Sequence, residues 1–85
     1  MDSEFEHQLQ KLRDKIGSKT PHQQQHAAML LAVEETITEQ KAPVEPASYF
    51  AALLTLMEQQ SGSGSNALSN AIIFLLSVVL PHVSA

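Results

Sequence analysis

Every Lys, Arg, Asp and Glu of this 85-residue chain lies at or before Glu58, so His82 is the only titratable side chain in the last 27 residues. Within this uncharged segment, residues 71–80 form a run of ten residues that is apolar except for Ser77. Apolar surface of that extent is unfavourable in water. The C-terminal segment therefore requires burial against the rest of the fold or against a partner.

A membrane-spanning helix would bury such a run, but it needs about 18–20 consecutive apolar residues. The run at 71–80 is shorter, contains Ser77 and directly follows Ser69 and Asn70. We therefore expect a buried helix in a helical stack and no membrane partner. A membrane-anchored peptide is kept as the third alternative for the whole chain.

Apolar residues at helical spacing predict four helices. Phe5, Leu9, Leu12 and Ile16 recur at spacings of four, three and four, which places them on one stripe of a helix that Gly17 ends. Apolar spacing, caps and breaks along the whole chain predict helices near 3–16, 21–40, 47–60 and 67–80.

The ends of the second helix carry separate signals. Thr20 is the expected N-cap, with Pro21 at the first helical position and Gln23 as the partner in a capping box. Pro43 and Pro46 then form a stiff linker, because proline has no backbone N–H and disfavours helix in the residue before it.

The second pair of helices is separated by the Ser-Gly run at residues 61–65. This run predicts a flexible solvent loop, with an engineered linker in place of a longer loop as the alternative. Pro81 is expected to end the fourth helix.

The four helices suggest two helical hairpins. A closed four-helix bundle would give each helix a polar outer face, and the fourth helix has almost none. In an α-solenoid, each hairpin is covered by the next one. We therefore predict an all-α fold in which residues 1–85 are one helical segment at the end of a much longer solenoid, with a closed four-helix bundle as the alternative. The residues expected to pack onto the next repeat are Ile73, Leu76, Val79 and Leu80.

Charge limits the classes of partner. The formal net charge of −4 argues against a general phosphate-binding surface. One basic cluster lies near the end of the first helix, where it also compensates the helix dipole. We regard it as a candidate contact for phosphate or protein, and it consists of Lys11, Arg13, Lys15 and Lys19.

No residue pattern indicates catalysis or metal binding. His22 and His26 are spaced like a pair of zinc ligands, but no third ligand is nearby and Gln23 stands where a zinc-protease motif has Glu. Glu34 and Glu35 are adjacent, so they point about 100° apart on a helix and cannot act as a paired acid and base. We expect no enzyme, no metal, no cofactor and no small-molecule substrate.

Three stretches, at residues 24–37, 49–56 and 74–82, carry a family resemblance. In order and approximate spacing they resemble the N-terminal segment of ribosomal RNA-processing protein twelve, a family of long HEAT-type α-solenoids in eukaryotic ribosome biogenesis. The resemblance covers most of this chain and rests on packing patterns. It carries over no catalytic or ligand-binding residue.

The resemblance implies a non-catalytic scaffold that binds pre-ribosomal particles and assists small-subunit maturation and nuclear export. The implied partners are downstream helical repeats of the same protein, proteins of the pre-ribosomal particle and, through that particle, pre-ribosomal RNA. The implied location is the nucleolus and nucleus, with passage to the cytoplasm. The alternative function is an autonomous helical adaptor that oligomerises through its apolar C-terminal helix.

Overall fold

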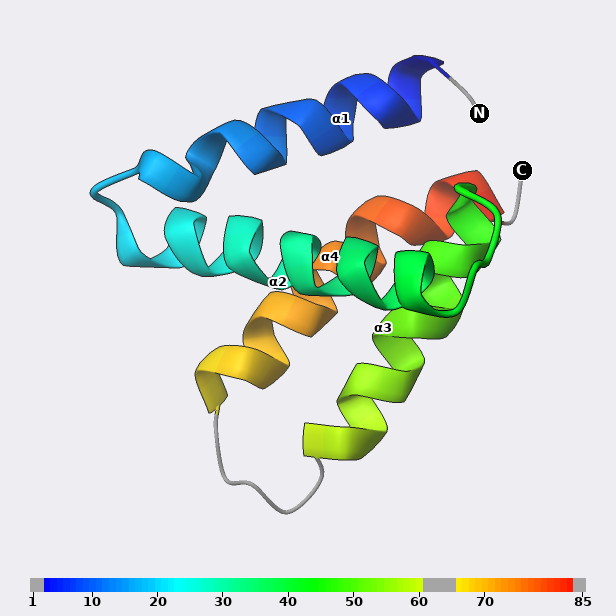
Figure 1. The fold of residues 1–85 in the computed structure, drawn as a ribbon. Coiled ribbons are helices and arrows are strands. Elements are labelled where there is room, and N and C mark those ends of the chain that lie inside the picture. Colours follow the sequence, from blue (N-terminus) through cyan, green and yellow to red (C-terminus); the bar gives the residue numbers. More distant parts are fainter. Residues whose placement is uncertain (1–2, 61–65, 84–85) are drawn as a thin grey trace.

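The computed structural model of the chain describes residues 3–60 and 66–83 (Figure 1). The described residues form four α-helices and one short 3₁₀ helix, and no strand. The all-α prediction is confirmed. The loop expected at residues 61–65 lies outside the described residues. The elements are α1 (Ser3–Arg13), η1 (Asp14–Gly17), α2 (Pro21–Glu39), α3 (Pro46–Gln60) and α4 (Asn66–Val83).

The helices form two stacked hairpins (Figure 1). α1 and α2 form the first hairpin, and α3 and α4 form the second. α2 is central, because it contacts α1 and η1 as well as both helices of the second hairpin. This arrangement explains why α2 contributes more buried residues to the core than any other described helix, namely Ala27, Met29, Leu30, Val33 and Ile37.

The core lies where α2 meets the other three helices. At one end of it, the rings of Phe5 and Tyr49 meet edge to face, with centroids 5.4 Å apart and planes at 81°. The His82 ring lies 4.8 Å from Phe5 and joins the end of α4 to the start of α1. The other buried apolar residues are Leu9, Ala27, Met29, Leu30, Val33, Ile37, Ala52, Leu53, Ala71, Ile72, Leu75 and Val79.

α4 does not end at Pro81 as the sequence predicts, but continues to Val83. A proline this close to the C-terminal end removes the hydrogen bond that its own N–H would donate to the carbonyl four residues earlier. The added turn brings His82 onto α1, where its Nε2 lies 2.9 Å from Oε1 of Gln8 and its ring packs on Phe5. These tertiary contacts offset the lost backbone bond.

The first apolar stripe is shorter than the spacing predicts. Phe5 and Leu9 are buried and Leu12 is half-buried, but Ile16 is exposed. The cause is the change from α1 to η1, because a 3₁₀ helix has 3.0 residues per turn instead of 3.6 and rotates Ile16 off the stripe.

α2 begins where the sequence predicts, but its cap differs. Thr20 is the N-cap and Pro21 follows it, yet the Thr20 hydroxyl makes no capping hydrogen bond. The Thr20 amide does not bond to the Gln23 side chain either, because Ser18 lies between them: Ser18 Oγ accepts from the Thr20 amide at 3.1 Å and donates to Gln23 Oε1 at 2.8 Å. The expected capping box is therefore wrong, and Ser18 bridges its two members.

α2 ends in a left-handed residue, Lys41, at φ 55°. The Lys41 amide donates to the Thr38 carbonyl and the Ala42 amide donates to the Ile37 carbonyl, both at 3.1 Å. This pair of bonds is the Schellman motif, whose left-handed position usually holds glycine.

We expect Lys41→Gly to raise the free energy of unfolding by about 0.5–1 kcal/mol, because glycine adopts a positive φ without the strain of a Cβ. Urea denaturation followed by circular dichroism measures this change. Lys41→Ala removes the same charge but keeps the Cβ, and it should give no gain. An equal gain in both variants would attribute the effect to charge.

Candidate interaction surfaces

Arg13 and Glu34 join α1 to α2 through a bidentate ion pair. Arg13 Nε donates to Glu34 Oε1 at 2.9 Å, and Arg13 Nη2 donates to Glu34 Oε2 at 2.6 Å. The Tyr49 hydroxyl of α3 donates to the same Oε2 at 2.9 Å. This Arg13–Glu34–Tyr49 network therefore fixes three helices relative to one another.

The network shifts the pKa of each member. Burial alone would raise the pKa of Glu34, but the hydrogen bonds from Arg13 and Tyr49 outweigh it and hold that pKa below its usual value. Burial, followed by the hydrogen bond to the Glu34 carboxylate, raises the pKa of Tyr49 to about 12. The hydrogen bond to Glu34 raises the already high pKa of Arg13. All three groups therefore keep their ordinary charge states near neutral pH.

Tyr49 is the chain's single tyrosine, so its titration can be followed without overlap. We expect tyrosinate absorbance to rise with a midpoint near pH 12 in the folded chain, against about 10 in urea. Because folding raises this pKa, the stability it contributes is present below pH 10 and is lost as the pH rises toward 12. A folded midpoint equal to that in urea would contradict the network.

Two neighbouring glutamates provide a matched comparison for this titration. Glu34→Gln should move the Tyr49 midpoint down toward 10 but not fully, because burial remains the largest cause of the shift. Glu35→Gln should leave the midpoint unchanged, since Glu35 is exposed and belongs to no part of the network.

The structure divides the basic cluster that the sequence groups together. Arg13 is bound to Glu34, whereas Lys11 and Lys15 line a pocket between α1 and α4. Lys19 lies after η1 and does not line that pocket. Lys11 and Lys15 are therefore exposed at a pocket, Arg13 belongs to an internal ion pair, and Lys19 lies apart from both.

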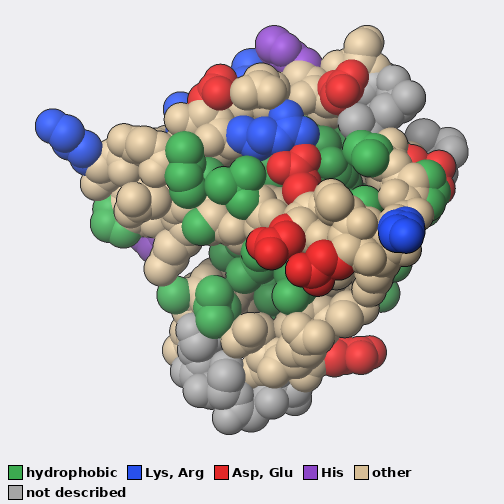
Figure 2. Space-filling model, in the orientation of Figure 1, with side chains coloured by type: hydrophobic (Ala, Val, Ile, Leu, Met, Phe, Trp, Pro, Cys, Tyr) green, Lys and Arg blue, Asp and Glu red, His purple; other side chains and the backbone are tan. Residues whose placement is uncertain are grey.

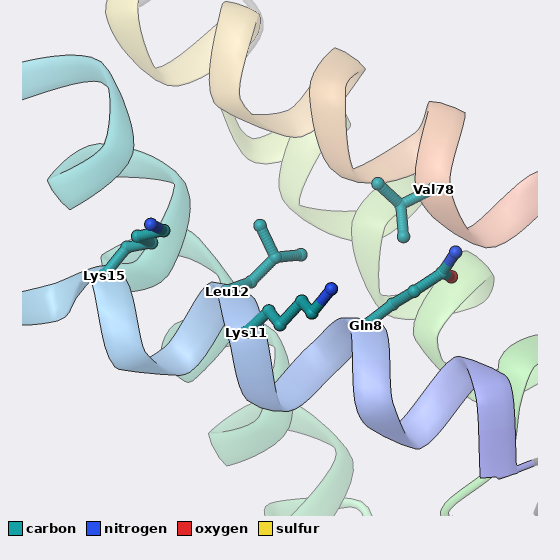
Figure 3. Close-up of a pocket in the computed structure, with 5 residues that line it drawn as sticks. All are labelled: Gln8, Lys11, Leu12, Lys15 and Val78. Carbon is teal, nitrogen blue, oxygen red and sulfur yellow. The ribbon is translucent and has the colours of Figure 1, made fainter.

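The pocket between α1 and α4 is lined by few residues and has a volume of about 220 Å³. Figure 3 shows Leu12 of α1 and Val78 of α4 pointing toward one another, with Lys11 and Lys15 beside Leu12. Gln8 completes the lining and is held by its contact with His82. We call this site the Lys11–Lys15 pocket.

A second surface is an apolar stripe along α4, formed by residues at spacings of three, four and three. Ile73 is 56% exposed and Leu80 is 44% exposed, whereas Leu76 is partly buried against the core. Val79, which the sequence places in the same set, is only 2% exposed. The expectation for Val79 is wrong because it lies on the side of α4 that carries Ile72 and Leu75 into the core. We call Ile73, Leu76, Leu80 and Val83 the α4 stripe.

The surface around the second hairpin is poor in charge. On the face drawn in Figure 2, acidic and basic side chains gather over α1 and α2, and the α3–α4 hairpin presents mostly uncharged surface. On another side of α4, the Phe74 ring stacks on His26 of α2, with centroids 3.9 Å apart and planes at 5°. Burial, followed by the nearby His22, lowers the pKa of His26. This histidine therefore packs against an aromatic ring, and among the described residues no group of three or more candidate ligands could hold a metal.

α4 is long and apolar enough to cross a membrane by length and composition. The apolar run at residues 71–80 is ten residues long, but the helix extends through 18 residues, so length does not exclude a span. A core helix of a water-soluble protein passes the same test. Of this helix, 22% is buried, along the line of Ala71, Ile72, Leu75 and Val79, which pack against the other helices. One side of α4 therefore belongs to the core, and the other sides keep apolar surface outside it.

Most of the chain matches a known protein family. Residues 9–85 match the family described as RRP12-like, N-terminal HEAT repeats. The chain belongs to this family. No curated protein and no solved structure matches the chain. The resemblance found in the sequence is thereby confirmed, and the two helical hairpins are the start of a HEAT-type α-solenoid.

The RRP12-like match covers most of both surfaces. It begins at Leu9, within α1, and continues through α4. HEAT repeats are helical scaffolds in which each hairpin packs on its neighbours. Glu34 as the centre of the network and Val78 as a wall of the pocket were not predicted, because neither role has a local sequence signal.

Proposed function

We propose that this chain is a non-catalytic scaffold segment in eukaryotic ribosome biogenesis, acting in small-subunit maturation and nuclear export. The observation that carries the proposal is the RRP12-like family match over residues 9–85. The stacked hairpins with an exposed apolar stripe on the last helix support it, because a solenoid needs such a surface between repeats.

The proposed first partner is the next helical hairpin of the same protein. Ile73, Leu76 and Leu80 would form its docking surface, since they follow successive turns of α4 and retain exposed apolar area. Burying such side chains contributes roughly 1.5–3 kcal/mol each when burial is complete. The α4 stripe therefore joins this segment to the rest of the solenoid.

The further partners are proteins of the pre-ribosomal particle, with pre-ribosomal RNA reached through that particle. Direct RNA binding by this segment is secondary in the proposal, because the net charge is −4 and Arg13 is already paired with Glu34. The proposed location is the nucleolus and nucleus, with passage to the cytoplasm together with the particle.

The test is a replacement experiment in the cells from which the chain derives. The gene is depleted and then complemented with the natural chain or with a variant, and small-subunit precursor RNA and gradient sedimentation are measured. We expect depletion to accumulate the precursor and the tagged protein to sediment with small-subunit precursors. Normal precursor levels after depletion would contradict the proposal.

A surface-matched pair of variants links that experiment to the structure. Ile73→Glu with Leu80→Glu changes the α4 stripe, and Ile16→Glu with Val44→Glu changes two exposed apolar residues on other elements. Only the first pair should fail to restore maturation.

The second candidate function is an autonomous adaptor that self-associates through α4. The exposed α4 stripe also favours it, because a second copy could cover the same residues. Light scattering distinguishes the adaptor from the scaffold segment. A discrete homo-oligomer that persists when the following hairpins are added favours the adaptor.

A further inference from the structure

The Lys11–Lys15 pocket combines an apolar interior with a cationic rim. Its interior is formed by the facing side chains of Leu12 and Val78, and its rim carries the two lysine ammonium groups (Figure 3). Gln8 closes one end and is fixed by His82, so this part of the wall is already in place without a ligand.

The two lysines lack counter-ions within the described residues. Lys11 lies on α1 and Lys15 lies on η1, and both line the same pocket, so their like charges repel one another there. The facing wall supplies no carboxylate, because residues 66–83 of α4 contain no acidic side chain. The nearby Asp14 carboxylate accepts from Gln10 at 2.9 Å. Carboxylates from a partner would therefore relieve an unfavourable local charge arrangement.

The size of the pocket selects the kind of group that enters. Small-molecule sites usually have volumes of about 300–1,000 Å³, and this pocket of about 220 Å³ is smaller. It suits a single large apolar side chain better than a cofactor. Its lining has no aromatic residue on which a nucleic-acid base could stack.

We propose that the Lys11–Lys15 pocket binds an acidic peptide segment of a partner protein. The segment inserts one large apolar side chain between Leu12 and Val78 and places carboxylates on the amines of Lys11 and Lys15. The inference concerns this chain alone and does not depend on the ribosomal role proposed above, so either proposal can fail without the other.

The binding experiment uses the whole chain and a fluorescein-labelled heptapeptide whose central leucine is flanked by glutamates. Fluorescence anisotropy measures its Kd. We expect binding by the natural chain and a loss of about tenfold or more in the Lys11→Glu, Lys15→Glu variant. Lys11→Gln with Lys15→Gln, which removes the charges without reversing them, should give an intermediate loss.

The matched control is Lys19→Glu with Lys41→Glu. It changes the net charge by the same amount, but neither lysine lines the pocket. We expect it to weaken binding by less than about threefold, through the general field of the protein alone. Equal weakening by both pairs would overturn the proposal, provided that circular dichroism shows unchanged helix content.

Two further probes test the apolar half of the site and the alternative ligand. A peptide with alanine in place of the central leucine should bind several-fold more weakly, and equal binding would overturn the insertion of a side chain. A labelled oligouridine should bind less tightly than the leucine peptide. Tighter RNA binding that is lost in the Lys11→Glu, Lys15→Glu variant would assign the pocket to phosphate instead.

Discussion

Leu30→Ala is expected to lower the free energy of unfolding by about 2–5 kcal/mol. Leu30 is 2% exposed and lies on α2, the helix that contacts all the others. The substitution removes apolar contacts and leaves a cavity that stacked helices can only partly close. Because small domains have total stabilities of about 5–15 kcal/mol, this loss is a large share of the whole.

The next residue provides the control for this prediction. Leu31 is 44% exposed, so Leu31→Ala removes similar atoms from a site that is largely in water. We expect a loss below about 1 kcal/mol. Urea denaturation followed by circular dichroism measures both variants, and equal losses would mean that α2 packs with a different face inward.

Local features were predictable because they depend on residues close together in the sequence. Helical spacing predicted where each helix lies, and Phe5 and Leu9 are buried as their stripe requires. Pro21 starts α2 because a proline fits the first helical position. Pro81 does not follow such a local rule. A proline was expected to end α4, but the contacts of His82 with α1 stabilise its continuation to Val83.

Features that depend on the stacking of the hairpins were not predictable. Spacing places Arg13 near the lysines in the sequence, but its partner Glu34 is 21 residues away. Nothing local shows that the two helices meet at these positions. The same holds for the contact of Gln8 with His82 across 74 residues, and for the assignment of Val79 to the core. Periodicity gives the angle between side chains on one helix, and only the tertiary fold decides which face is covered.

The chain is also expected to bind a hydrophobic dye or to self-associate when it is isolated. The α4 stripe is the reason, because Ile73 and Leu80 keep large exposed fractions on a helix with no charged residue. Burying both at an interface would contribute about 3 kcal/mol or more. Ile73→Glu with Leu80→Glu removes that contribution and adds charge, so it should weaken self-association by about a hundredfold or more.

Dye fluorescence and sedimentation velocity measure this effect, with Ile16→Glu and Val44→Glu as the control pair. Both control positions are exposed apolar residues outside α4, so the control adds the same charge without changing the α4 stripe. If general repulsion between charged chains caused the effect, the two pairs would behave alike. If the α4 stripe causes it, only the first pair gives a dye-silent monomer.

A longer chain distinguishes between the two partners that could bury the α4 stripe, which are the next hairpin and a second copy of this chain. If the next hairpin is the natural cover, a version with one or two following hairpins should lose dye binding and self-association at α4 without any substitution. If a second copy is the cover, the extended version should still form a discrete oligomer that the Glu pair disrupts. A short chain that is already a dye-silent monomer would contradict both. Ile73 and Leu80 would then be ordinary surface residues, and the closed four-helix bundle would replace the end of a solenoid.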